Sequence, residues 1–553
     1  MNKGYWRDGS AWIWLNGGAV TISIVMVFGL LALIFARGFT HFWPHTIYEF
    51  EYQNPQTQQV ESFMGVLRRS ETLTGQAMRD AGVPIPEDQL LVTRHLFKVG
   101  NRDLTGRDFT FFIEDYIRGQ REVPRGVVAL ERREWGDFYG RPVELRELDR
   151  VVAVGDRVWP ELQERLKRSS ALLDEIRHIE RVEIGNVNYR LERVRLDQRR
   201  AELRGELTPE REAGFRERRE ALNAEYAVIQ ERLDQLINDS RRDVLVMETA
   251  NGQRQSIRLG DIVHAWQPND MSVPAKLGFY ARSFRDFIFG YPREANTEGG
   301  IFPAIFGTVT MVFVMAILVT PFGVLAAIYL REYARQGPLL KAIRISVYNL
   351  AGVPSIVFGV FGLGFFVYII GGSIDQAFYP EALPAPTFGT PGLFWASLTL
   401  ALLTLPVVIV STEEGLARIP STIRSGSLAL GATKGETLWK VVVPLATPAM
   451  MTGLVLAIAR AAGEVAPLML VGVVKLAPTL PIDGNFPFVH LERKIMHLGF
   501  HIYDVGFQSP NAEAAEQIVY ATALILVILI VLLNLTAIMI RNRLREKYRA
   551  DGD

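Results

Sequence analysis

The chain has 553 residues and a formal net charge of zero, because 60 Lys and Arg residues balance 60 Asp and Glu residues. The charged fraction of 22% is ordinary, but charged residues are almost absent from several long segments. There is no cysteine, which excludes disulfides and thiolate metal sites. Any domain outside the cytoplasm must therefore be stabilised by packing alone.

Six apolar segments are each long enough, or nearly so, to cross a hydrocarbon core of about 30 Å. Backbone groups in lipid must be satisfied within the segment, and these segments lack the alternation of a membrane β-barrel, so we expect helices. The fold class predicted is a mainly α, polytopic membrane protein with six transmembrane helices. A secretory signal is the alternative for the first segment, but Arg37 and bulky aromatic residues follow it in place of a small-residue cleavage motif. The segments are 20–36, 301–330, 345–371, 393–410, 447–474 and 518–540.

Basic residues flank these segments on one side of the predicted membrane, which places both termini and two loops in the cytoplasm. Residues 39–300 then lie on the opposite side of the membrane, and the family resemblance described below implies that this side is the periplasm of a bacterial inner membrane. We divide the chain into a tail and first helix (1–38), a periplasmic domain (39–300), a membrane core (301–545) and a cytoplasmic tail (546–553). The flanking residues are Lys3, Arg7, Arg331, Arg335, Lys341, Arg344, Arg418, Arg424, Lys434, Lys440, Arg541, Arg543, Arg545, Lys547 and Arg549.

The periplasmic segment is predicted to be an inserted α+β domain. Strand-like patterns cover 91–159 and 243–266, and Asn251-Gly252 in the second range is a strong hairpin signal. Between them, 160–240 is highly charged, with apolar residues at spacings of four and three, which predicts a helical hairpin. The helix break lies at Gly185-Asn186 or at Thr208-Pro209.

The sequence leaves the role of this domain open. The charged hairpin is either a solvated face or a docking arm. A fused solute-binding domain is disfavoured, because too little chain remains for two lobes once the hairpin is removed. The arginines of 211–219 are interleaved with acidic residues, which argues against a nucleic-acid partner.

The loop 411–446 connects the fourth and fifth spans and carries a recognisable spacing. Ser425-Gly426-Ser427-Leu428-Ala429-Leu430-Gly431 is followed by nine residues and then by Val441-Val442-Val443-Pro444. Gly431 permits a tight reversal between two short helices, and Pro444 can begin the next helix. The loop resembles the EAA loop of ABC importer permeases, which implies contact with an ATPase. Ser425, Gly426 and Ser427 stand where that pattern has Glu-Ala-Ala, so the expected carboxylate is lost or supplied by Glu413, Glu414 or Glu436.

The fifth predicted span carries Arg460 and Glu464 at its middle. A charged residue at the bilayer centre costs about 2.5 to 3.5 kcal/mol, so two charges four residues apart need each other or a polar pathway. The pair therefore points to a membrane transport protein. A structural ion pair between helices is the alternative.

Residues 301–545 resemble one family of ABC importer permeases, PstA. Three motifs carry the resemblance: Asn349 to Gly359, Ser427 to Thr433, and Ala459 to Pro467. It implies a type I importer that passes inorganic phosphate inward by alternating access. The implied partners are a PstC-like permease, a PstB-like ATPase dimer that uses ATP and Mg, and a PstS-like phosphate-binding protein. No cofactor is expected on this chain, and membrane lipid surrounds it.

Within this resemblance, Arg460 supplies planar donors suited to phosphate oxygens. Glu464 can accept a hydrogen bond from a protonated phosphate and repel a fully ionised sulfate. Small residues and prolines are expected to serve mainly helix packing and kinks. These residues are Gly352, Pro354, Ser355, Gly359, Gly463 and Pro467.

No catalytic site is expected. The sequence has no Gly-rich phosphate-binding loop followed by Lys and Ser or Thr, and its histidines lack zinc-ligand spacing. His490, His497 and His501 are expected near a short helix lying on the membrane surface. The alternatives to phosphate import are transport of phosphonate or sulfate, a membrane sensor or scaffold, and a secondary transporter.

Overall fold

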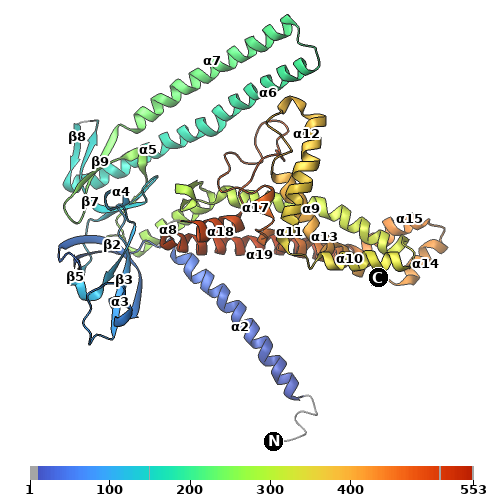
Figure 1. Cartoon of the computed structure of the whole chain (residues 1–553), viewed down its shortest axis with the longest axis horizontal. Helices are drawn as coiled ribbons and strands as arrows, with labels where there is room; N and C mark the ends of the chain where they lie inside the picture. Colours follow the sequence, from blue (N-terminus) through green and yellow to red (C-terminus); the bar gives the residue numbers. More distant parts are fainter. Residues whose placement is uncertain (1–9, 149, 510–511, 551–553) are drawn as a thin grey trace. The chain divides into compact units, whose positions relative to one another are not determined.

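The computed structural model describes residues 10–148, 150–509 and 512–550 (Figure 1). Lys3, Arg7 and residues 551–553 lie outside the described residues, and so do the side chains of Arg545, Lys547 and Arg549. The chain forms two compact units. Unit 1 comprises the residues up to His41, Ile301–Tyr379 and the residues from Leu383 onward, and unit 2 comprises Phe42–Gly300 with Pro380–Ala382.

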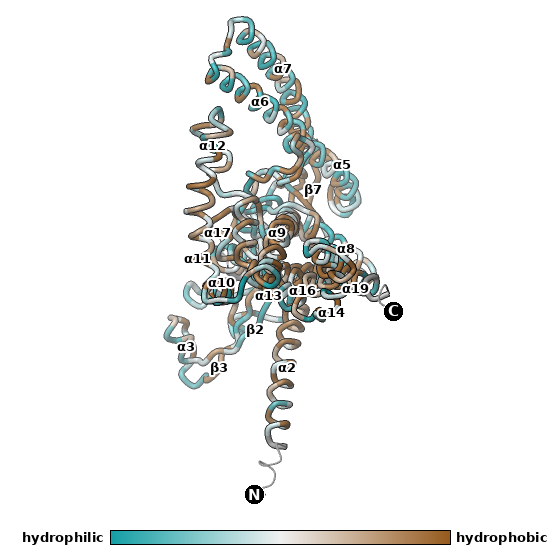
Figure 2. Tube along the Cα trace, turned by 90° about the vertical axis from the view of Figure 1, so that its right-hand side faces the viewer, coloured by the Kyte–Doolittle hydropathy of each residue, from teal (hydrophilic) through white to brown (hydrophobic). Residues whose placement is uncertain are grey.

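Unit 1 contains six helices that are long and apolar enough to cross a membrane, within the described part of the chain. This confirms the number of spans expected from hydropathy, and Figure 2 shows hydrophobic residues along these helices. The spans are Trp12–Thr40, Phe302–Tyr333, Ser355–Phe378, Leu393–Ala417, Lys434–Gly463 and Ala515–Leu544.

The helical elements of unit 1 follow the chain in order, and several join end to end within one span. The α-helices are α2 (Ser10–Thr40), α9 (Phe302–Ile328), α10 (Pro338–Leu350), α11 (Ser355–Phe361), α12 (Gly372–Phe378), α13 (Leu393–Ala417), α14 (Ser421–Ala429), α15 (Lys434–Thr437), α16 (Val443–Gly463), α17 (Leu468–Val471), α18 (Leu498–Gln508) and α19 (Ala512–Ala550). Wider π-helical turns are η6 (Tyr329–Tyr333), η7 (Gly362–Gly371) and η9 (Leu438–Val442).

Two predicted spans have the wrong boundaries. The third begins at Ser355 and not at residue 345, because the chain turns between Gly352 and Pro354 and α10 is a separate helix. The fifth ends at Gly463, and Glu464 is already extended with φ −77° and ψ 137°. Pro467 favours this end, since it has no amide to donate to the Gly463 carbonyl four residues earlier and its ring crowds that carbonyl.

The core of unit 1 lies between α9, α13 and α16. Fully buried Met315 on α9, Leu400 on α13 and Ala461 on α16 belong to one apolar cluster. Glycine allows the helix backbones to come close, because a Cβ on Gly453 would lie 2.6 Å from the Ser411 Cβ. Small residues at helix crossings are typical of membrane bundles, where packing replaces the hydrophobic effect between helices.

Unit 2 contains two large antiparallel sheets and one two-stranded sheet in its described residues. The first has the strand order β4-β3-β2-β1-β5, and the second has β10-β9-β7-β6-β11 with β8 paired to β7. Phenylalanines fill the first sheet's core, and α5 covers the second with Val158 and Leu162. The strands are β1 (Ile47–Gln53), β2 (Val60–Thr74), β3 (Leu91–Lys98), β4 (Phe109–Ile113), β5 (Ile117–Glu122), β6 (Val128–Arg132), β7 (Asp137–Glu147), β8 (Arg150–Val154), β9 (Asp243–Glu248), β10 (Arg254–Arg258) and β11 (Ile262–Trp266).

The structure has strands outside the predicted ranges at two places. β1 and β2 precede Leu91, where no strand was expected, and β2 pairs with β3 over much of its length. The Asn251-Gly252 hairpin is present, with β9 and β10 paired around it and Gly252 at φ 79°. Short helices, α3 (Gly75–Asp80) and α4 (Arg102–Thr105), lie between strands, and the two-residue strands β12 (Pro292–Arg293) and β13 (Glu298–Gly299) pair with each other.

A long helical hairpin is inserted between β8 and β9 (Figure 1). It consists of α5 (Val158–His178), a π-helical turn η3 (Ile179–Glu183), α6 (Ile184–Leu203) and α7 (Pro209–Ser240). The reversal occurs before Pro209, and the Thr208 side chain accepts a hydrogen bond from the Arg211 amide to cap α7. Of the two breaks considered, the structure therefore places the turn at Thr208-Pro209.

An ionic cluster joins β6, β11 and α8 (Val273–Phe289) inside unit 2. His264 Nδ1 lies 2.8 Å from Glu131 Oε2, and its Nε2 lies 3.2 Å from Asp286 Oδ2. Burial lowers the pKa of His264, but hydrogen bonds to Asp286 and Glu131 outweigh it and raise that pKa to about 9. His264 is therefore charged in the folded protein at neutral pH.

Unit 2 is expected to lose stability at alkaline pH because the folded state holds this proton more tightly than the unfolded state. The protonated His264 contributes on the order of 3 kcal/mol to the free energy of unfolding. This contribution is complete when the pH is below about 6.5, the pKa in the unfolded state, and it is lost as the pH rises through about 9, the pKa in the folded state. Limited proteolysis of the full chain from about pH 6 to pH 10 measures it. His264→Gln should flatten this dependence, and an unchanged profile in that variant would contradict the assignment.

Candidate functional site: a charged helix end and a cytoplasmic hairpin

Arg460 and Glu464 meet at the C-terminal end of α16. Arg460 Nε donates to Glu464 Oε1 at 3.4 Å, so the two residues do interact across four positions. The prediction that they lie at the middle of the span is wrong, because α16 ends at Gly463. A cation is favoured at this end by the helix dipole.

The pair is only partly enclosed. The Arg460 side chain is 34% exposed and that of Glu464 is 19% exposed. Glu464 is the sole ion-pair partner of Arg460 among the described residues, and it contacts Nε alone. The two terminal guanidinium nitrogens therefore keep donors that an incoming anion can use.

The segment after Glu464 packs tightly against α11. A Cβ on Gly359 would lie 2.7 Å from the Pro467 Cα, so glycine is needed for this approach. Gly362 is similarly close to Thr399 on α13, whereas a Cβ on Gly463 would meet open space. Gly352 lies in the turn before Pro354 and Ser355, where α11 begins.

The loop after α13 forms a hairpin of two short helices, α14 and α15. Gly431 turns the chain between them with φ 89°, and a Cβ at this position would have no atom within 4 Å. Thr433 and Glu436 form a reciprocal capping box at the start of α15. Pro444 occupies the first turn of α16. Ser427 bonds Thr437 through their hydroxyls at 2.9 Å, which ties the two arms together.

The three carboxylates considered for the loop have different surroundings. Glu413 pairs with Arg344 at 2.5 Å and is largely buried. Glu436 caps α15 by accepting hydrogen bonds from the Thr433 amide at 3.0 Å and from its hydroxyl at 2.9 Å. Glu414 remains exposed, with Arg418 4.0 Å away. Ser425 and Gly426 lie on α14, and Gly426 is exposed there.

Comparisons with known proteins identify a family and relatives for the membrane core. Residues 319–549 match the family described as "Binding-protein-dependent transport system inner membrane component". A "Phosphate transport system permease protein PstA" of Mycobacterium leprae is 37% identical over 219 residues, covering 39% of this chain and 66% of that protein. "PstA 1" of Mycobacterium tuberculosis H37Rv is 35% identical over 245 residues, covering 44% of this chain and 70% of that protein. The chain belongs to the PstA family.

A further relative and a solved structure extend the comparison. PstA of Yersinia pestis is 31% identical over 247 residues, covering 44% of this chain and 74% of that protein. The MetNI methionine ABC transporter in an inward-facing conformation aligns with 44% of this chain and 94% of its own chain, at 20% identity and a TM-score of 0.33. Residues 42–300 lie outside the family match, so unit 2 is an addition to the PstA-type core.

Sequence reasoning used Arg424 only as a marker of orientation and missed its structural role. Its guanidinium donates to the carbonyls of Leu416 and Ile419 at 2.8 and 2.7 Å and pairs with Glu332 at 2.9 Å. Lys434 on α15 donates to the backbone carbonyl of Glu332 at 2.5 Å, so both arms of the hairpin contact Glu332. Arg424 thus fixes the α14–α15 hairpin to the end of α13.

Apolar side chains exposed around the hairpin were also missed. Leu430 is 91% exposed and Trp439 is 60% exposed, and Leu428 and Ile423 are exposed on α14. A leucine this exposed beside a turn is unusual unless another surface covers it. The signal in the sequence was the run Leu428-Ala429-Leu430 before Gly431.

The short helix expected near the histidines is present as α18. In α18, Leu498, His501 and Val505 are buried, and His497 caps its start by accepting from the amides of Gly499 and Phe500. Lys475 pairs with Asp504 at 3.2 Å. The face that carries His501 therefore packs against the protein, and the location of α18 at the membrane surface stays a prediction.

Proposed function

We propose that this chain is the membrane-spanning permease subunit of an ATP-driven importer that carries inorganic phosphate into the cytoplasm by alternating access. Membership of the PstA family carries the proposal, since several relatives are named phosphate transport system permeases. The unused donors of Arg460 at the end of α16 support an oxyanion as cargo.

The hairpin of α14 and α15 supports an ATPase partner. It is a compact, pre-folded projection with exposed Leu430 and Trp439 and with Arg424 holding its base. An apolar knob of this kind fits a groove on another protein. The proposed complex contains a PstC-like permease, two PstB-like ATPase subunits that bind ATP and Mg, and a PstS-like phosphate-binding protein.

ATP-dependent uptake in liposomes tests this function. The chain is purified with its co-expressed neighbours, reconstituted, and supplied with labelled phosphate and the binding protein. We expect uptake that needs ATP and is not competed by sulfate or a phosphonate. Competition by either anion would reassign the cargo, and ATPase binding without solute flux would favour a sensor or scaffold.

Orientation is part of the proposal. The basic residues at Arg331, Arg424 and Arg541 place these loops in the cytoplasm and unit 2 in the periplasm. Protease added outside spheroplasts should cut within 160–240 and leave 423–436 intact. Cleavage within 423–436 alone would show that the chain has the opposite orientation.

A further inference from the structure

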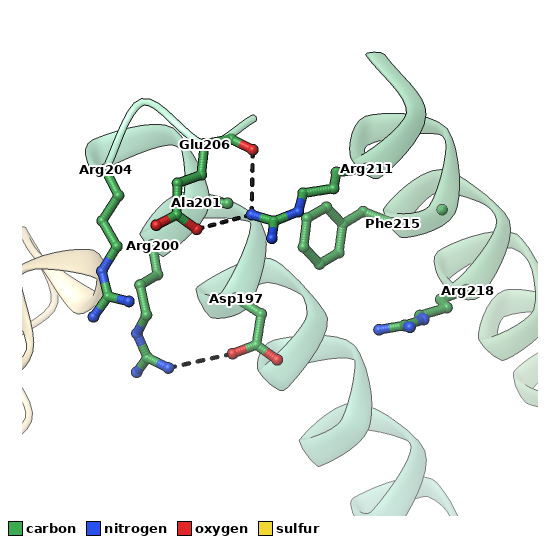
Figure 3. Close-up of a pocket in the computed structure, with 9 residues that line it drawn as sticks. Asp197, Arg200, Ala201, Arg204, Glu206, Arg211, Phe215 and Arg218 are labelled. Atoms are coloured by element: carbon green, nitrogen blue, oxygen red, sulfur yellow. Dashed lines mark hydrogen bonds and ion pairs between the residues drawn. The ribbon is translucent and has the colours of Figure 1, made fainter. Parts of the chain in front are cut away.

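A cleft of about 340 Å³ lies at the far end of the helical hairpin, between α6 and α7 (Figure 3). Arg200 and Arg204 line it from α6 and the turn, and Arg211 and Arg218 line it from α7. Figure 3 shows the ring of Phe215 beside Arg211, on the side toward Arg218. The cleft thus combines four guanidinium groups with one aromatic surface.

Two of these arginines are neutralised within unit 2. Arg211 donates to Glu206 Oε2 at 2.8 Å, and Arg200 lies 3.5 Å from Asp197. Arg200 also donates from Nε to Glu381 Oε1 at 3.2 Å, so it already holds a buried carboxylate.

Arg204 and Arg218 form no ion pair with any described residue, and they come from opposite sides of the cleft. Other arginines on α6 do form ion pairs with nearby acids, as in Arg195–Glu192 and Arg199–Glu202 at 2.6 Å. The lining holds four arginines against two acidic residues, Asp197 and Glu206, so the cleft carries a local excess of positive charge.

We propose that this cleft binds an acidic segment of a partner protein, with carboxylates on Arg204 and Arg218 and an apolar or aromatic side chain on Phe215. Guanidinium groups bind carboxylates through paired, charge-assisted hydrogen bonds and also stack on aromatic rings. The inference goes beyond phosphate transport, because it assigns a partner-binding role to unit 2.

A peptide fits this cleft better than free phosphate does. The cationic groups are spread over both helices, and a single tetrahedral anion would leave part of them and the Phe215 ring without a contact. The lining arginines are also well exposed, Arg211 at 56%, and exposed charges bind small ions weakly in water. Several weak contacts along one chain add up to useful affinity.

The test measures binding of a fluorescent peptide, Glu-Glu-Tyr-Glu-Glu, to the full chain in detergent. Arg204→Glu with Arg218→Glu should weaken binding by about tenfold or more, because each change replaces an attraction with a repulsion. The matched control is Arg193→Glu with Arg216→Glu. It makes the same charge change on the same two helices, at exposed positions outside the cleft and without ion pairs among the described residues. It should change affinity by less than about twofold.

Three results would overturn the proposal. An equal loss of affinity in both double variants would show that the peptide is attracted by the overall charge of the hairpin and not by the cleft. Displacement of the peptide by inorganic phosphate at a lower concentration than by unlabelled peptide would show a small-anion site. Absence of peptide binding to the unsubstituted chain would remove the site. Phe215→Ala keeps every charge and should weaken the binding of Glu-Glu-Tyr-Glu-Glu more than the binding of Glu-Glu-Ser-Glu-Glu. This test does not require the arginine variants to fold.

Discussion

Replacing Arg460 with glutamine is expected to abolish phosphate uptake while the protein still inserts and assembles. Among the described residues the guanidinium pairs with Glu464 alone, at 3.4 Å through Nε, which leaves its terminal donors for an anion. Glutamine removes the charge and also relieves part of its burial cost, so folding should tolerate the change. Loss of a charge-assisted contact of this kind lowers transport by about a hundredfold or more. Phosphate uptake in liposomes measures this loss of transport, and size-exclusion chromatography shows whether the complex still assembles.

Glu464 provides the control that separates a cargo contact from a structural ion pair. If the pair only ties the helix end to its surroundings, Arg460→Gln combined with Glu464→Gln should restore transport, because two amides can hydrogen-bond across the same turn. If Arg460 contacts phosphate, the double variant stays inactive. Glu464→Gln alone should then change discrimination against sulfate more than assembly.

The features that sequence could predict are those that depend on local spacing. Hydropathy indicated six spans, because a lipid-facing helix must be apolar over its length. The four-residue spacing of Arg460 and Glu464 indicated their contact, although the helix ends between them. Gly431 was predicted as a turn because few other residues adopt its positive φ.

Features that depend on distant parts of the chain could not be predicted. Arg424 pairs with Glu332, which lies 92 positions earlier, and nothing in the local pattern links the two. The histidine-bearing helix α18 looked amphipathic, but its polar face packs inward, where His497 caps the helix and Asp504 pairs with Lys475. β1 and β2 carry mixed polar and apolar residues, and the pairing of β1 with β2 and of β2 with β3 defines them as strands more than their own composition does.

Replacing Gly431 with valine is expected to weaken docking of the ATPase and so to reduce ATP-driven transport. The backbone at this position has φ 89°, which a β-branched residue adopts only with strain on the order of 1 to 3 kcal/mol. The strain should reshape the turn between α14 and α15 and displace Leu430 beside it. Membrane insertion should stay normal, because the spans are untouched. Co-purification of the ATPase and ATP-driven uptake measure the effect, and both should fall by about tenfold or more.

Gly426→Val is the matched control, since Gly426 lies within helical α14 with open space around its Cβ. Valine is no worse than glycine inside a helix, so the hairpin should keep its shape. If valine at 426 is tolerated and valine at 431 is not, the turn itself positions the docking surface. Equal loss at both positions would mean that the partner contacts this surface wherever side chains are added, and normal coupling in Gly431→Val would remove the role proposed for the hairpin.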